Sequence, residues 1–128
     1  MTSVESSLST LYQHRFDDAD LAFKAATWSI LCEDYFSRWI HPDDTVLDLG
    51  AGSCEFINAV HAHRRLAVDL NPDTKEAAEP GVDVHLTRSD EMTGIETDSV
   101  DVVFSSNFFE HLPDPDALMA TLAESRRV

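Results

Sequence analysis

The residues best suited to chemistry follow an apolar stretch near the middle of the chain. In VLDLGAGSCEF (residues 46–56) the apolar run holds one carboxylate, Asp48, and gives way to Gly50 and Gly52. Because glycine has no side chain, the backbone there can approach a ligand closely, and free N–H groups at the start of a following helix favour a negative group. This stretch is therefore a candidate ligand-binding loop.

Three more clusters of polar residues follow apolar stretches further along the chain. Asp69 ends the second stretch, and its two carboxylate oxygens suit the paired hydroxyls of a ribose. The other two clusters are Ser89, Asp90 and Glu91, and SSNFFEHLPDP at residues 105–115. Ligands bind at the carboxyl ends of the strands in open parallel sheets, so we expect all four clusters at one edge of such a sheet.

The elements that must position these clusters alternate between strand and helix. The predicted strands are residues 45–49, 66–69, 82–86 and 100–105, and the predicted helices are residues 53–62, a short helix near 72, and 114–127. Strands that alternate with helices pair in parallel through right-handed crossovers. We therefore predict an α/β fold with a Rossmann-like, doubly wound parallel sheet.

A long amphipathic helix is predicted ahead of the sheet, from Asp17 to Ile40, with Pro42 as its stop. Its apolar residues recur at alternating steps of four and three, which places them on one face. That face consists of Leu21, Ala25, Trp28, Cys32, Tyr35 and Trp39. We expect it to pack against the rest of the chain, as part of an N-terminal cap helix region at residues 1–44.

The amino-acid composition limits which partners and which cellular location we expect for this chain. Lys and Arg number 9 against 24 Asp and Glu, so the formal net charge is -15, and such a surface repels phosphate backbones and anionic lipid headgroups. We therefore expect no nucleic acid and no membrane as a partner. Cys32 and Cys54 have no metal or redox spacing, and neither a secretory signal nor an apolar membrane span is visible, which predicts a cytoplasmic protein without a metal.

Two classes of cofactor share the geometry of a glycine-rich loop after a strand. A nicotinamide fingerprint has a third glycine where this chain has Glu55, and Asp48 would lie close to the pyrophosphate. S-adenosylmethionine carries a sulfonium, an ammonium and one carboxylate but no phosphate, so it suits a loop that bears a carboxylate. A nicotinamide-dependent dehydrogenase half-domain remains the less favoured alternative.

The chain resembles the class I S-adenosylmethionine-dependent methyltransferases in three segments. VLDLGAGSCEF, AVDLNP and DSVDVVFSSNFFEHLPDP are similar to the first, second and fourth strand motifs of that family. The resemblance implies that residues 45–128 form an S-adenosylmethionine-binding Rossmann-like domain with the first four strands of the family fold. It further implies a methyltransferase that acts on a small-molecule, sugar or lipid-type acceptor.

The resemblance also implies which residues hold the cofactor. Asp48, Gly50, Ala51, Gly52 and Asn107 would line its methionine end, with the glycines also on the ribose side. Asp69 would hold the ribose hydroxyls and Leu70 would lie beside the adenine, whose amino group would bind Asp90 or, in its place, Ser89 or Glu91.

The chemistry implied is an in-line displacement of a methyl group from sulfonium. Holding the reactants about 3 to 3.5 Å apart and in line supplies most of the rate of such a step. An oxygen or nitrogen nucleophile can also need a base, for which His111 and Glu110 are nearest in sequence, although a histidine there can equally pack or cap the next helix. Phe108 and Phe109 are expected chiefly as walls of the core and pocket.

The last predicted helix reaches Val128, whereas in the family it leads through a glycine turn to a fifth strand. We therefore expect a domain truncated before the fifth strand, with the apolar fourth strand at an edge where a second copy can pair to form a homodimer. A fragment that binds the cofactor without turnover is the alternative to an active enzyme.

Overall fold

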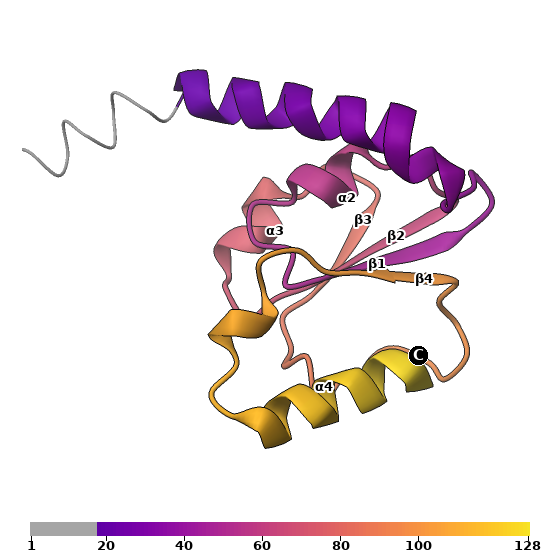
Figure 1. The fold of residues 1–128 in the computed structure, drawn as a ribbon, viewed down its shortest axis with the longest axis vertical. Coiled ribbons are helices and arrows are strands. Elements are labelled where there is room, and N and C mark those ends of the chain that lie inside the picture. The colour runs from indigo at the N-terminus through magenta and orange to yellow at the C-terminus, as the bar shows by residue number, and fades with distance from the viewer. Residues whose placement is uncertain (1–17) are drawn as a thin grey trace, which may run out of the picture.

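The computed structural model describes residues 18–128, and its centre is a four-stranded sheet in which every strand pair is parallel. The strands are β1 (Thr45–Leu49), β2 (Arg64–Val68), β3 (Val82–His85) and β4 (Val102–Phe104), in the spatial order β3-β2-β1-β4 (Figure 1). The chain adds β2 and β3 on one side of β1 and then crosses to add β4 on the other. The point where strand order reverses therefore lies between β1 and β4, which is where an open α/β sheet binds its ligand.

Helices cover both faces of this sheet. The helix that begins the described chain and α2 (Glu55–Ala59) lie over one face, and α4 (Pro115–Arg127) lies over the other (Figure 1). A short helix, α3 (Asp73–Ala77), follows β2. Strand β1 alternates between the two layers, because Val46 packs in the core on the α2 side while Leu47 and Leu49 pack in the core on the α4 side. Asp48 therefore faces the α2 side, together with the N-terminal helix.

Local chemistry sets the helix ends. The Asp114 side chain caps α4 by accepting a hydrogen bond of 2.8 Å from the backbone N–H of Ala117, and Pro115 occupies the first turn. Helix α2 is shorter than the predicted residues 53–62, because Cys54 before it is left-handed (φ 64) and Val60 after it is extended. The predicted α/β class, the doubly wound parallel sheet and the leading helix are confirmed.

The predicted inward face of the leading helix is only partly right. Residues 18–30 are α-helical, but a π-helical turn at Leu31–Tyr35 and a 3-10 turn at Phe36–Arg38 follow. Cys32 is buried and Trp28 half-buried as expected, and Leu21, Ala25, Tyr35 and Trp39 are exposed. A π turn takes up more residues than an α turn, so it moves the inward stripe from Tyr35 and Trp39 to Phe36 and Ile40. The predicted start at Asp17 lies outside the described residues.

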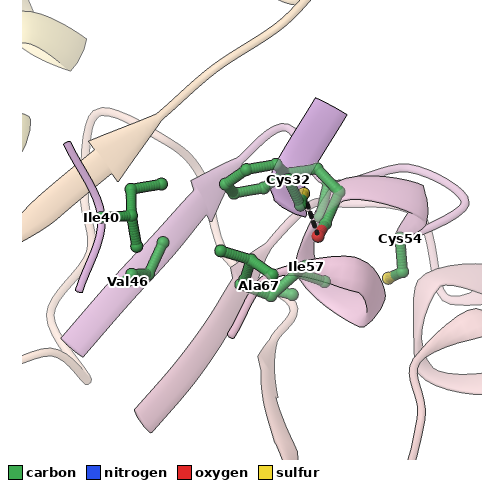
Figure 2. Packing of buried hydrophobic residues seen from close by; sticks show 9 residues of the cluster. Cys32, Ile40, Val46, Cys54, Ile57 and Ala67 are labelled. Carbon is green, nitrogen blue, oxygen red and sulfur yellow. Dashed lines mark hydrogen bonds between the residues drawn. The ribbon is translucent and has the colours of Figure 1, made fainter. Parts of the chain in front are cut away.

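The corrected stripe forms the core beneath the helix. Figure 2 shows Cys32 and Ile40 facing Val46 and Ala67 of the sheet, with Ile57 of α2 alongside. The Cys32 thiol donates a weak hydrogen bond of 3.9 Å to the Phe56 carbonyl oxygen (Figure 2). Within residues 18–128, no helix is both long and apolar enough to cross a bilayer.

Candidate functional site

Two pockets open at the carboxyl ends of the strands, and the narrower one lies at the β1/β4 switch point. Its volume is about 290 Å³. Its wall includes Asp48 of β1, Gly52 of the following loop and Glu55 at the start of α2. Phe104 and Asn107 come from the end of β4 and the loop after it. The N-terminal helix contributes Lys24 and Trp28. The narrower pocket thus joins segments from three distant parts of the sequence.

The wider pocket, of about 470 Å³, lies beside it along the same edge of the sheet. Asp69 and Leu70 enter it from the end of β2, and Ser89 and Asp90 enter it from the loop after β3. Phe108 forms another part of its wall. All four sequence clusters therefore meet at one sheet edge, as predicted, but they divide between two pockets.

Asp69 stands between the two pockets. Its Oδ2 accepts a hydrogen bond of 2.8 Å from the backbone N–H of Gly52, a residue of the narrower pocket, and its Oδ1 accepts one of 2.9 Å from the N–H of Asn71. A carboxylate offers about four acceptor sites, so two remain for a ligand. Because both oxygens are held by backbone amides, the carboxylate is fixed in place before a ligand arrives.

The two glycines of the loop have different roles. Both have positive φ, 76° at Gly50 and 53° at Gly52. A Cβ added at Gly50 would overlap the Phe108 ring, whereas one added at Gly52 would meet no atom within 4 Å. Gly50 therefore makes room for packing within the protein, and Gly52 leaves its backbone open to the narrower pocket.

Asp48 is the most unusual ionisable group of the site. Its side chain is buried, with 4% of the residue exposed, and burial raises its pKa from 3.8 to about 7, with the charges of Glu55 and Asp69 adding to the effect. The backbone amide of Ile57 opposes this shift. A cation in the narrower pocket would stabilise the ionised carboxylate, whereas a pyrophosphate would destabilise it further. The site therefore suits a cationic ligand.

The structure separates the three candidates for the adenine amino group. Asp90 lines the wider pocket and is held by Arg88, whose Nη2 and Nε donate to its two oxygens at 2.7 and 2.9 Å, which lowers the pKa of Asp90. The Ser89 hydroxyl shares a hydrogen bond of 2.8 Å with Thr121. Glu91 is exposed and belongs to neither pocket wall. Of the two carboxylates, only Asp90 lines the wider pocket, and Ser89 reaches it with a hydroxyl that is buried and bonded to Thr121.

The two expected bases lie away from the narrower pocket. His111 is in the wall of the wider pocket, and its Nε2 lies 3.8 Å from Oε1 of Glu110. Their side chains are 73% and 58% exposed. Their role as bases stays a prediction, and neither residue lines the narrower pocket. Among residues 18–128, no three metal-ligating side chains lie together.

The sequence analysis did not identify which residues of the N-terminal helix reach the site. Trp28 was expected chiefly to pack, and no sequence pattern distinguishes Lys24. Arg88 also reaches the wider pocket, which Phe108 lines as expected. Lys24, Trp28 and Arg88 have no sequence signature, because each position depends on how elements far apart in the chain cross in space.

Comparisons with known proteins agree with this geometry. A protein family described as a methyltransferase domain matches residues 47–128. No curated protein has a sequence that matches the chain. Twelve solved chains match its structure, and three of them illustrate the similarity.

The first is a protein from Methanococcus maripaludis assigned as an S-adenosyl-L-methionine-dependent methyltransferase, with a TM-score of 0.71 and 17% identity over 89% of this chain and 56% of that one. The second is an S-adenosylmethionine-dependent methyltransferase from Archaeoglobus fulgidus, with a TM-score of 0.65 and 22% identity over 93% of this chain and 52% of that one.

The third is phosphoethanolamine N-methyltransferase 1 from Haemonchus contortus in complex with phosphoethanolamine and S-adenosylhomocysteine, with a TM-score of 0.64 and 19% identity over 99% of this chain and 30% of that one. The chain thus spans 56% or less of the length of each of these three proteins.

These similarities confirm the predicted fold, and they support S-adenosylmethionine rather than a nicotinamide dinucleotide as the cofactor. The family match covers more than half of the chain and runs from within β1 to the end of α4. The chain belongs to the methyltransferase domain family.

Proposed function

We propose that this chain binds S-adenosylmethionine across the two pockets and takes part in transfer of its methyl group to a small-molecule acceptor. The methionine end would occupy the narrower pocket and the adenosine end the wider one, with the ribose at Asp69 between them. When bound, the cofactor supplies a methyl group on a positively charged sulfur that leaves as a neutral thioether.

The observation that carries this proposal is the buried carboxylate of Asp48 beside the open backbone of Gly52, at the β1/β4 switch point. Burial of a carboxylate without a cation is costly, and the nearby charges of Glu55 and Asp69 increase the cost. A ligand with a sulfonium and an ammonium would offset it. A dinucleotide would bring two phosphates to the same place.

The residues of the wider pocket suit an adenosine. Asp69 retains two acceptor sites for ribose hydroxyls, and Asp90 retains acceptor sites for an exocyclic amino group after its contacts with Arg88. Leu70 and Phe108 supply apolar surface for the faces of a base. These roles follow the expected assignments for Asp69, Leu70 and Asp90.

In the narrower pocket, the protein would act by orientation rather than by covalent chemistry. Asp48 and Asn107 would fix the methionine end, and the half-buried ring of Trp28 would limit access of water. An in-line displacement gains most from such fixed geometry, because the reactants need only be held within about 3 to 3.5 Å. The role of His111 as a base for an acceptor that must lose a proton stays a prediction, because His111 lines the wider pocket rather than this one.

A small acceptor is favoured over a nucleic acid by the formal net charge of -15. The phosphoethanolamine bound to the Haemonchus contortus enzyme is an example of such a compact polar molecule. Sugars and lipid-type molecules remain within the same proposal.

Titration calorimetry with S-adenosylhomocysteine and with NAD tests the cofactor. We expect binding of the first and none of the second, and Asp69→Ala should weaken binding at least tenfold because two ribose contacts are lost. Asp83→Ala removes an exposed carboxylate of β3 that pairs with Arg64 and serves as the matched control. Tighter binding of NAD, or equal affinity in both variants, would refute the proposed site. Transfer of radiolabelled methyl groups into a small-molecule extract then distinguishes an enzyme from a cofactor-binding protein without turnover.

We also propose that the chain forms a homodimer along β4. Within the described residues β4 pairs only with β1, so its outer edge presents unpaired backbone groups.

A further inference from the structure

The narrower pocket carries a charge pattern that the family match does not explain. Asp48 and Glu55 are its two carboxylates, and Lys24 is the one cationic side chain among the described residues that line it. The methionine end of the proposed cofactor has two cationic groups, the sulfonium and the ammonium, and one carboxylate. Two anions and one cation in the pocket therefore complement two cations and one anion in the ligand.

The position of Lys24 is fixed by the residues one and two turns further along the helix. Trp28 makes edge contacts with Phe56 and Phe104, at ring-centroid distances of 6.1 and 5.9 Å. Cys32, in the π turn that continues this helix, is buried, and its thiol donates to the Phe56 carbonyl oxygen (Figure 2). Residues four apart share one face of a helix, so Lys24 lies on the face that Trp28 and Cys32 hold against the site.

Lys24 also has no competing partner in the described part of the chain. No carboxylate of residues 18–128 forms an ion pair with it, whereas four of the arginines, Arg64, Arg65, Arg88 and Arg127, each pair with a carboxylate. Among residues 18–128, nothing therefore competes with an anion in the narrower pocket for the Lys24 ammonium.

We propose that Lys24 binds the carboxylate of the methionine end of the cofactor. The proposal rests on the proposed function, because it requires the cofactor in this orientation. It assigns a binding residue to the N-terminal helix, which lies outside the matched residues 47–128. The helix would then contribute to cofactor affinity through Lys24, in addition to covering the core.

The test is calorimetry on the 128-residue chain with two ligands, S-adenosylhomocysteine and its analogue that lacks only the carboxylate. Lys24→Met should weaken binding of S-adenosylhomocysteine roughly fivefold, the effect of losing one charge-assisted contact made by a side chain that is exposed in the free chain. The same substitution should leave the decarboxylated analogue unchanged or bound slightly more tightly, because the pocket becomes more negative. Lys24→Arg should retain most of the affinity.

Lys75→Met is the matched control, because Lys75 is the only other lysine and is exposed on α3, away from both pockets. It makes the same change in net charge and should affect neither ligand. Circular dichroism of each variant checks that the fold is retained.

Equal weakening of both ligands by Lys24→Met would overturn the proposal, since Lys24 would then act through the shape of the pocket. If Lys24→Met changed the affinity for neither ligand, the proposal would also be overturned. Lys24 would then be a candidate to bind an anionic group of the acceptor instead. If the unaltered chain failed to bind S-adenosylhomocysteine, the proposed function itself would be refuted. If the unaltered chain bound it and Lys24→Met bound it equally well, only the role of Lys24 would be refuted.

Discussion

Replacing Asp48 by asparagine should stabilise the folded chain above neutral pH and weaken its binding of a cationic ligand. The carboxylate is buried, and its pKa is raised to about 7 by burial and by Glu55 and Asp69. Asparagine has nearly the same shape but cannot ionise. The substitution therefore removes the cost of a buried charge with little change in volume.

The size of the effect follows from the pKa difference. In the unfolded chain Asp48 ionises near 3.8, and in the folded chain it ionises near 7. Between these values the folded state holds a proton that the unfolded state has released, so stability falls as pH rises and levels off above pH 7. At about 1.4 kcal/mol per pKa unit, the full cost is on the order of 4 kcal/mol, an upper limit. Roughly 2.7 kcal/mol of it develops between pH 5 and pH 8.

The assay is urea unfolding of both proteins at pH 5 and pH 8. We expect the free energy of unfolding of Asp48→Asn, relative to the unaltered chain, to rise by about 2.7 kcal/mol between the two pH values. Comparing two pH values cancels any packing or hydrogen-bonding change that the amide introduces. Asp83→Asn, at an exposed position of β3, controls for the loss of one negative charge from a chain of net charge -15.

A relative free energy that is the same at pH 5 and pH 8 would refute this reasoning, because Asp48 would then ionise alike in the folded and unfolded chains. The same variant should bind S-adenosylmethionine about tenfold more weakly at pH 8, because a neutral amide stabilises a nearby cation less than a carboxylate does. A gain in stability together with a loss of affinity is the pattern expected of a strained functional residue.

Three further predictions concern the ligand, the glycine loop and the sheet edge. The affinity for S-adenosylmethionine relative to S-adenosylhomocysteine should rise about tenfold from pH 6 to pH 8, following the ionised fraction of a group with a pKa of about 7, and a flat ratio by calorimetry would contradict it. Gly50→Ala should cost roughly 3 kcal/mol or more in urea unfolding, because of its positive φ and its contact with Phe108. Gly52→Ala should lower the free energy of unfolding by only about 1–2 kcal/mol but reduce cofactor affinity at least tenfold. A larger loss of stability in Gly52→Ala than in Gly50→Ala would be inconsistent with the loop geometry. Analytical ultracentrifugation should detect dimers that pair along β4, and a monomer at all concentrations would exclude this pairing.

Some features of this protein were readable from short stretches of sequence. The strand Thr45–Leu49 has the predicted bounds, because a β-branched and apolar run meets a glycine turn at its end. Gly50 and Gly52 both adopt the left-handed conformations that make glycine useful there. The cap of α4 at Asp114 is local as well, since a short carboxylate side chain bonds to an amide three residues on.

Other features were wrong or out of reach because they depend on distant contacts. The π turn at Leu31–Tyr35 moved the buried stripe by one residue, and no periodic pattern in the sequence shows such an insertion. Asp90 and Glu91 were both candidates to bind the adenine amino group. The fold of the loop after β3 places Asp90 in the wall of the wider pocket and leaves Glu91 exposed outside it. The overlap that a side chain at Gly50 would make with Phe108 joins residues that are far apart in the sequence.

By itself, the sequence determined the class of fold and the residue types that face a ligand, because backbone preferences and apolar periodicity act over a few residues at a time. The tertiary structure alone decided that Lys24 and Trp28 reach the pocket of Asp48, and that this carboxylate ionises near neutral pH. The first outcome arises because the N-terminal helix crosses the sheet beside the pocket. The second arises because folding buries Asp48 and brings the charges of Glu55 and Asp69 near it.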